Sequence, residues 1–414
     1  MKKILIIGLL VLGVAVGATV MTGRVFQEQL IKLEAEISKD PRLEVLENTI
    51  NEGMFSSSGK MTLVMNLEDN QRLMIESPWQ ASHFPGWVNY TGQTLLNLEL
   101  DAQDVINLLE EVGMAALDYK GTANWSKATF AMAVEPFIFN NASASLEVSG
   151  VDLVGTYHYS GEQTGLLTIK NLAFSDQDFS KTELGLSDLA LNWQQAGSYP
   201  WVEGAAELTA ERLYFSNHSQ QVELTKPSLS QAIAFNRQAF DYQFSLDVGE
   251  INSQGTDLGT GKLALKVADF NGQAMVDLVE VAAAHPNIEQ ASPEDLASIN
   301  AALNRLLAGS PAVILQTFDL DLKAPFVLQQ KTTGKLNFDG NNLPLSYLQQ
   351  IDAGSLEFAD LINRTRLELN FSKLDPGLLM MIGIPTSMLN ANQTEQTLIF
   401  EAGELKLNGN PIPL

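Results

Sequence analysis

Hydrophobic and polar residues alternate along much of the chain after residue 43. From Phe240 to Val248 every second residue is apolar, and the residues between them are Asp, Gln or Ser. Strands with one apolar face are typical of antiparallel sheets, because parallel sheets are usually covered on both faces. The pattern therefore predicts a mainly β protein. The same alternation recurs at 60–67, 188–193, 262–267 and 366–371.

Short turn sequences separate the predicted strands. Asn271-Gly272 and Asn408-Gly409 supply the positive φ angles that tight hairpins need. Consecutive strands should therefore pair as a meander in elongated, twisted antiparallel sheets. Since each strand keeps an apolar face, the sheets must curve on themselves, pack on another sheet or dimerise.

Helical spacing of apolar residues interrupts the strand pattern at a few places. The clearest case runs from Ser292, a good N-cap, to Leu307, with Pro293 at the first helical position. A second helix is predicted from Asp101 to Val112. Shorter helices are predicted at Leu345–Ile351 and Pro376–Ile382.

The longest apolar stretch runs without a charge from Ile4 to Met21. As a helix it would reach about 27 Å, close to the thickness of a bilayer's hydrocarbon core. Val16-Gly17-Ala18 would also suit the cleavage site of a signal peptide. The apolar character continues past that site, which favours a retained transmembrane anchor. Its apolar residues include Ile4, Leu5, Ile6, Leu9, Leu10, Val11, Leu12, Val14, Val16 and Val20.

The charges around this segment predict its orientation. Lys2 and Lys3 precede it, so the positive-inside rule places the N-terminus in the cytoplasm and the bulk of the chain outside. Residues 1–22 are the predicted anchor, and 23–41 are a predicted amphipathic stalk helix that ends at Asp40-Pro41. The stalk would either pack on the following domain or dimerise. Residues 42–414 form the β-rich region, as one elongated domain or as two sub-domains with a boundary near 285–311.

Composition narrows the classes of function. The 414 residues carry a formal net charge of −24, so a role in binding DNA or RNA is not expected. Cysteine is absent, which excludes disulfides, thiolate metal ligands and a cysteine nucleophile. Hydrophobic residues make up 45% of the chain, which is enough for a core without such cross-links.

No motif in the sequence indicates a particular reaction. The four histidines form no pair at metal-ligand spacing, and neither a phosphate-binding loop nor a nucleophile elbow occurs. We therefore expect no catalytic residues, no metal and no cofactor. One cluster of interest is the aromatic stretch from Trp79 to Tyr90, which would be either a loop anchored to the core or a loop that contacts sugar or a membrane interface.

The stretch from Asn51 to Leu63 resembles the signature of the YdgA/YihF-like bacterial envelope proteins, a family of unknown function. The resemblance lies in Gly53, Phe55, Ser56 and Ser57, which come directly before a predicted strand. It implies a single-pass protein of a Gram-negative inner membrane, with its bulk in the periplasm and a homodimer as one possible assembly. The chain is also similar in style to AsmA-type envelope proteins, whose long sheets curl into an apolar groove for lipid.

These features together predict a non-enzymatic envelope protein that is anchored in the inner membrane. Its curved sheet would bind lipid or a protein partner in a groove. One alternative is a homodimeric structural or assembly factor of the envelope. The other is a glycan hydrolase that uses two of the many carboxylates beside the aromatic stretch.

Overall fold

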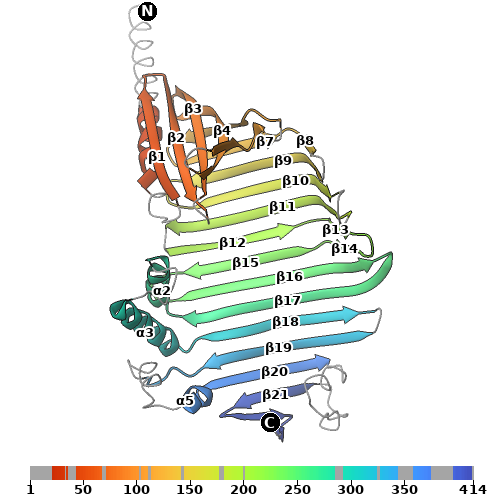
Figure 1. Ribbon diagram of the computed structural model, residues 1–414. Helices are drawn as coiled ribbons and strands as arrows, with labels where there is room; N and C mark the ends of the chain where they lie inside the picture. Colours follow the sequence, from red (N-terminus) through yellow and green to blue (C-terminus); the bar gives the residue numbers. More distant parts are fainter. Residues whose placement is uncertain are drawn as a thin grey trace, which may run out of the picture. The chain divides into compact units, whose positions relative to one another are not determined.

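A computed structural model shows that the protein is mainly β (Figure 1). The chain divides into an N-terminal unit, residues 1–199 with 216–218, and a C-terminal unit, residues 200–215 with 219–414. The predicted sub-domain boundary near 285–311 falls inside the C-terminal unit. The structure describes residues 21–32, 34–35, 43–67, 71–101, 104–110, 113–140, 144–176, 181–198, 201–284, 292–323, 327–343, 358–373 and 395–412.

An antiparallel sheet forms the N-terminal unit. Its main strands pair in the order β1-β2-β3-β4-β6-β7-β9-β10-β11, while β5 pairs with β4 and β8 pairs with β9. The predicted antiparallel meander is thus confirmed in this unit. The strands are β1 (Leu43–Glu52), β2 (Ser56–Asn66), β3 (Arg72–Phe84), β4 (Trp87–Asp101), β5 (Asp104–Asn107), β6 (Leu117–Asn124), β7 (Lys127–Val134), β8 (Phe137–Asn140), β9 (Ala144–His158), β10 (Gln163–Asp176) and β11 (Glu183–Ser198).

Aromatic rings in this sheet lie across glycines of neighbouring strands. Trp193 of β11 stands directly opposite Gly165 of β10, and Phe130 of β7 stands opposite Gly155 of β9. A Cβ atom on either glycine would overlap the facing ring. The missing side chain therefore lets a large ring lie flat on the sheet. The same pairing joins Trp79 to Gly59, Tyr119 to Gly92 and Tyr90 to Gly121.

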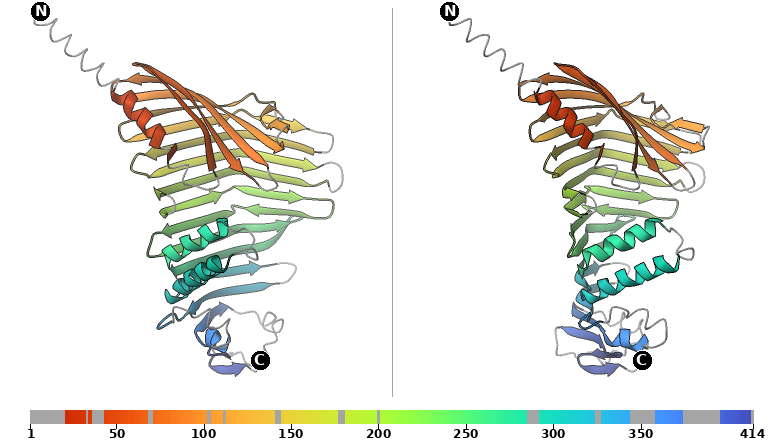
Figure 2. Two further views of the ribbon diagram at one scale, coloured as in Figure 1. Left: turned by 60° about the vertical axis from the view of Figure 1, so that its left-hand side comes forward. Right: turned by 90° about the vertical axis from the view of Figure 1, so that its left-hand side faces the viewer.

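A helix packs on the aromatic side of the N-terminal sheet (Figure 2). Residues 21–32 are helical and bring Phe26 to the sheet, where the side chain is only 7% exposed. The Phe26 ring stacks on Tyr90 at 5.7 Å and meets Trp79 edge-on at 5.8 Å, both measured between ring centroids. The described part of the predicted stalk helix therefore packs on its own domain.

The C-terminal unit is also an antiparallel sheet. Strands pair in the order β12-β15-β16-β17-β18-β19-β20-β21-β22-β23, and β14 pairs with β16. After β15, each strand therefore pairs mainly with the strands before and after it in the chain. The strands are β12 (Trp201–Thr209), β13 (Arg212–Ser216), β14 (Gln221–Thr225), β15 (Ser228–Phe235), β16 (Phe240–Ser253), β17 (Thr256–Phe270), β18 (Ala312–Leu322), β19 (Leu328–Phe338), β20 (Thr365–Lys373), β21 (Gln396–Glu401), β22 (Glu404–Leu407) and β23 (Asn410–Ile412).

Helices α2 (Gly272–Ala284) and α3 (Pro293–Ala308) lie side by side in this unit (Figures 1 and 2). The helix predicted from Ser292 is confirmed as α3. Asn271-Gly272 was expected to form a hairpin turn, and that prediction is wrong. Asn271 instead caps α2, because its side-chain oxygen accepts a hydrogen bond from the Ala274 amide at 2.9 Å. A short helix, α5 (Phe358–Asn363), follows β19.

The helix predicted from Asp101 to Val112 does not form in the described residues of that stretch. Residues 104–107 are strand β5, which pairs with the end of β4. The Asn107 side chain accepts hydrogen bonds from the amides of Leu109 and Glu110 at 3.0 and 3.3 Å. This local turn competes with helix formation, and the β-branched Val105 and Ile106 favour pairing with β4.

Three predicted elements lie outside the described residues. They are the predicted anchor at 1–22, apart from its last two residues, and the short helices at 345–351 and 376–382. Within the described part of the chain, no helix is long and apolar enough to cross a membrane.

Candidate functional site

One face of the C-terminal sheet is apolar from β15 to β21, and we call it the apolar face. Residues directly opposite one another on paired strands project from the same side of a sheet, so the register defines its rows. Six strand spacings of about 4.8 Å give the face a width of about 29 Å. The rows are Ile233, Tyr242, Val267, Val313, Leu336, Leu367 and Phe400; Phe244, Leu265, Leu315, Gly334, Leu369 and Leu398; and Leu229, Leu246, Leu263 and Phe318.

Three residues of the apolar face are exposed to solvent, and most of the others are half-buried. Leu246 is 36% exposed, Val313 37% and Leu336 41%, whereas the inner faces of a closed sandwich would bury such residues. Near its far edge the face is closed, because Leu398 and Leu407 are buried in a cluster with the last strands. The exposed residues therefore lie on β16, β18 and β19, while Thr332 and Gln330, on the same face of β19, are buried. Contiguous exposed apolar surface of this kind usually marks an interaction site.

The opposite face of the same sheet is charged. A row of alternating sign runs from Asp247 through Lys262 and Asp319 to Lys331. Lys262 Nζ lies 3.0 Å from Asp247, and Lys331 Nζ lies 3.3 Å from Asp319. These exposed ion pairs add little stability, but they keep this face in water. The two faces thus differ in chemistry: one is charged and well solvated, and the other is apolar.

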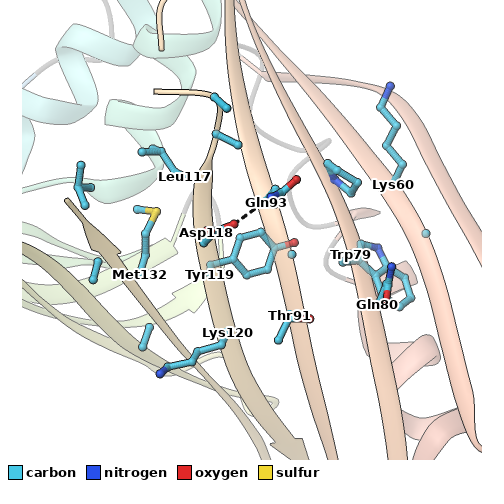
Figure 3. Close-up of a pocket in the computed structure, with 18 of the residues that line it drawn as sticks. Lys60, Trp79, Gln80, Thr91, Gln93, Leu117, Asp118, Tyr119, Lys120 and Met132 are labelled. Atoms are coloured by element: carbon cyan, nitrogen blue, oxygen red, sulfur yellow. Dashed lines mark hydrogen bonds between the residues drawn. The ribbon is translucent and has the colours of Figure 1, made fainter. Parts of the chain in front are cut away.

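The N-terminal unit has a groove of different character. It has a volume of about 1440 Å³ and runs across strands β1 to β4, β6, β7 and β9. Register places Thr91 opposite Lys120, and Gln93 opposite Asp118, on the side away from the aromatic–glycine pairs. Figure 3 shows the Gln93 amide donating to Asp118, a hydrogen bond of 3.0 Å. The groove is therefore lined by hydroxyl, amide and charged groups together with apolar side chains such as Met114, Leu117 and Met132.

Two lysines, Lys60 and Lys120, line this groove beside four carboxylates. Lys60 Nζ lies 2.6 Å from Glu76 and 3.5 Å from Glu47. Hydrogen bonding to Glu76 raises the pKa of the Lys60 ammonium. Among the described residues, Lys120 makes no ion pair. Lys120 is thus a cation available to a polar partner.

The residues that carry the family resemblance hold the start of the helix. Ser57 Oγ lies 2.9 Å from His83 Nε2, and both side chains are buried. The His83 ring packs directly on Gly23 of the helix, where a Cβ atom would overlap it. The carbonyl of Phe55 accepts a hydrogen bond of 2.9 Å from the His83 amide. Ser57 and Phe55 therefore act through His83, which fixes the helix on the sheet.

Gly53 and Ser56, the other two residues of the resemblance, lie where β1 turns into β2. A Cβ atom on Gly53 would approach the backbone oxygen of Ser56 to 2.5 Å, so glycine allows the tight turn. Their contribution is structural. His83 was not singled out by the resemblance, although its place within the aromatic stretch from Trp79 to Tyr90 pointed to this region. That stretch is the β3–β4 hairpin, and Trp79 anchors it to the core.

Burial lowers the pKa of His83 below its ordinary value of 6.5. The folded state therefore favours the neutral imidazole, and this contribution to stability is present above pH 6.5 and lost as the pH falls below it. We expect the urea midpoint of the N-terminal unit to fall between about pH 7.5 and about pH 5.5. Tryptophan fluorescence would follow the transition. His83→Gln should weaken this pH dependence, and an equal pH dependence in both proteins would contradict the role of His83.

The described residues contain no group of three or more histidines and carboxylates placed to hold a metal ion. The side chain of His83 interacts with a serine rather than with a carboxylate.

Residues 1–325 match a family described as "Bacterial protein of unknown function (DUF945)". No curated protein and no solved structure matches the chain.

Proposed function

Since the chain belongs to the bacterial family DUF945, whose function is unknown, we propose that it is an envelope protein that holds the acyl part of a lipid on the apolar face. In this proposal the segment 4–21 anchors the protein in the inner membrane and the two sheets lie in the periplasm. The chain would group with the YdgA/YihF-like proteins of the family. Its sheet would bind lipid on an apolar surface, as the sheets of AsmA-type proteins do.

The observation that carries the proposal is the open apolar face of a sheet whose other face is charged. Burying apolar surface is worth about 25 cal/mol for each Å², so covering the face by an acyl chain is favourable. A width of about 29 Å is close to the thickness of a bilayer's hydrocarbon core and leaves room for extended acyl chains. The groove of the N-terminal unit mixes apolar side chains with charged and amide groups, whereas the rows of the apolar face are apolar throughout, which favours the C-terminal unit as the lipid site.

A charge placed on the apolar face should strongly reduce lipid contact. We expect Leu246→Glu to reduce crosslinking at least about tenfold, because a carboxylate against acyl chains is strongly unfavourable. The full chain would be reconstituted with phosphatidylcholine that carries a diazirine on one acyl chain. After illumination, mass spectrometry would count lipid adducts on peptides from β16 and β17.

Gln243→Glu is the matched control for this experiment. It adds the same charge to the same strand, but Gln243 stands on the opposite face and is exposed. Its adducts should equal those of the unaltered chain. Equal adducts in both variants, or adducts confined to other peptides, would remove the proposal.

A second copy of the chain is the other occupant that the apolar face could take, as in a homodimeric assembly factor. Because the chain has no cysteine, a single Leu246→Cys substitution reports this directly. An oxidative crosslink at residue 246 in membranes, with none at a cysteine in place of Gln243, would favour the dimer over lipid. If neither cysteine variant forms a crosslinked dimer, the homodimer hypothesis would be contradicted.

A protein partner is a second candidate function, supported by the polar groove of the N-terminal unit. Threonine, amide and lysine side chains there suit an extended peptide more than an acyl chain. A photocrosslinking residue in place of Thr91 would test this in cells, and the lack of any protein adduct would contradict it. The glycan hydrolase is the third candidate. Of the carboxylates that line the groove, Asp118 and Glu47 have partners in Gln93 and Lys60, whereas Glu135 and Asp152 have none among the described residues.

A further inference from the structure

Exposed aromatic and thioether side chains gather at one end of the N-terminal sheet, and we call them the tip surface. Phe55 is 54% exposed, Trp87 48% and Trp125 46%, although large aromatic residues are usually well buried. Each lies in or beside a hairpin turn. Met54 and Phe84 are exposed as well.

Contacts join these residues into one surface. Phe84 and Trp87 stack across the β3–β4 turn with their centroids 5.4 Å apart. The β1–β2 turn is tied to this hairpin by the hydrogen bond from the His83 amide to Phe55. A Cβ atom on Gly86 would lie 3.8 Å from Nε1 of Trp125, so the β6–β7 turn adjoins as well. Three hairpin turns thus present their apolar side chains together.

The start of the helix lies at the same end of the sheet. The Thr22 hydroxyl accepts a hydrogen bond of 3.1 Å from the Gly86 amide, and Thr22 is buried. In the sequence, Thr22 directly follows the uncharged run from Ile4 to Met21. A membrane helix formed by that run would therefore leave the bilayer beside the tip surface.

The chemistry of the tip surface fits the boundary between headgroups and acyl chains. Tryptophan and other amphipathic rings concentrate at membrane–water interfaces. The strong negative charge of the chain disfavours attraction to anionic lipids, so apolar insertion rather than charge would provide the contact. We therefore expect the tip surface to contact zwitterionic rather than anionic lipids.

From this placement we infer that the tip surface rests in the outer headgroup region of the bilayer that holds the anchor. Phe55, Trp87 and Trp125 insert into that interface, and the docked helix keeps the N-terminal sheet upright on the membrane. The contact is separate from the apolar face, so it does not depend on lipid binding there. It does rest on the proposed anchor.

The absence of cysteine allows a direct test in the full chain. Phe55→Cys and Leu67→Cys place single thiols at the two ends of β2, both at exposed apolar positions. Each variant would be labelled with an environment-sensitive fluorophore and reconstituted into phosphatidylcholine vesicles containing a nitroxide-labelled lipid. We expect the label at residue 55 to be quenched at least about twofold, and the label at residue 67 to stay unquenched.

Flotation of the same vesicles separates the possible failures. Vesicle-bound protein with equally unquenched labels at both positions would overturn the inference while leaving the anchor in place. That result is also expected if the tip surface serves a protein partner, since the vesicles contain none. Protein that does not float with the vesicles would overturn the inference together with the anchor.

Discussion

Replacing Gly165 by valine is expected to lower the free energy of unfolding of the N-terminal unit by about 3 kcal/mol, at the upper end of the usual cost of overpacking. The Cβ of any larger residue would overlap the six-membered ring of Trp193, which lies flat on this glycine. The Trp193 ring must then leave the sheet or push the strands apart. Urea unfolding followed by tryptophan fluorescence would measure the loss.

Gly261→Val is the matched control for this substitution. Gly261 also lies within a strand, but its Cβ would meet only Leu320 Cδ1, at 3.8 Å. We expect it to change stability by less than about 0.5 kcal/mol, as for an ordinary surface substitution. If Gly165→Val were as mild as Gly261→Val, the aromatic–glycine pairs would not be rigid elements of the fold.

Truncating Phe26 is expected to release the helix from the N-terminal sheet. Changing a buried phenylalanine to alanine typically lowers the free energy of unfolding by about 3–5 kcal/mol, because apolar burial is lost and a cavity is left behind. Phe26 is the ring that contacts both Trp79 and Tyr90. The Trp79 emission should therefore shift to longer wavelength, and limited proteolysis should cut the chain near the helix.

Ile31→Ala provides the comparison for Phe26→Ala. It truncates an apolar residue on the same helix, but Ile31 is 56% exposed. Its effect on unfolding and proteolysis should be small. Similar proteolysis of the two variants would mean that the helix is held by something other than the aromatic cluster.

Local periodicity made much of the fold predictable from the sequence. Alternation at 240–248 and 366–371 identified strands β16 and β20, because the side-chain period of a strand is visible in a short window. The cap at Ser292 and the apolar stripe after it identified α3. By contrast, the apolar residues at 101–112 suited a helix by spacing alone, and pairing with β4 overrides that spacing.

The sites depend on register, which the sequence does not display. Leu246 and Leu336 belong to one apolar face only because the intervening strands place their rows in line. The aromatic–glycine pairs also need the partner strand to be known. A signal was present, since isolated glycines such as Gly155 and Gly165 within apolar strands mark close approach of another group. The role of His83 could not be predicted without knowing where the helix packs on the sheet.

The meander of the C-terminal unit sets how its apolar face can change in size. From β15 to β23 each strand pairs mainly with the strands next to it in the chain. Insertion or loss of one hairpin between two strands would therefore alter the face by about 10 Å and leave the remaining pairs intact. If the apolar face binds lipid as proposed, the number of hairpins in a homologue would set the width of the surface available to that lipid.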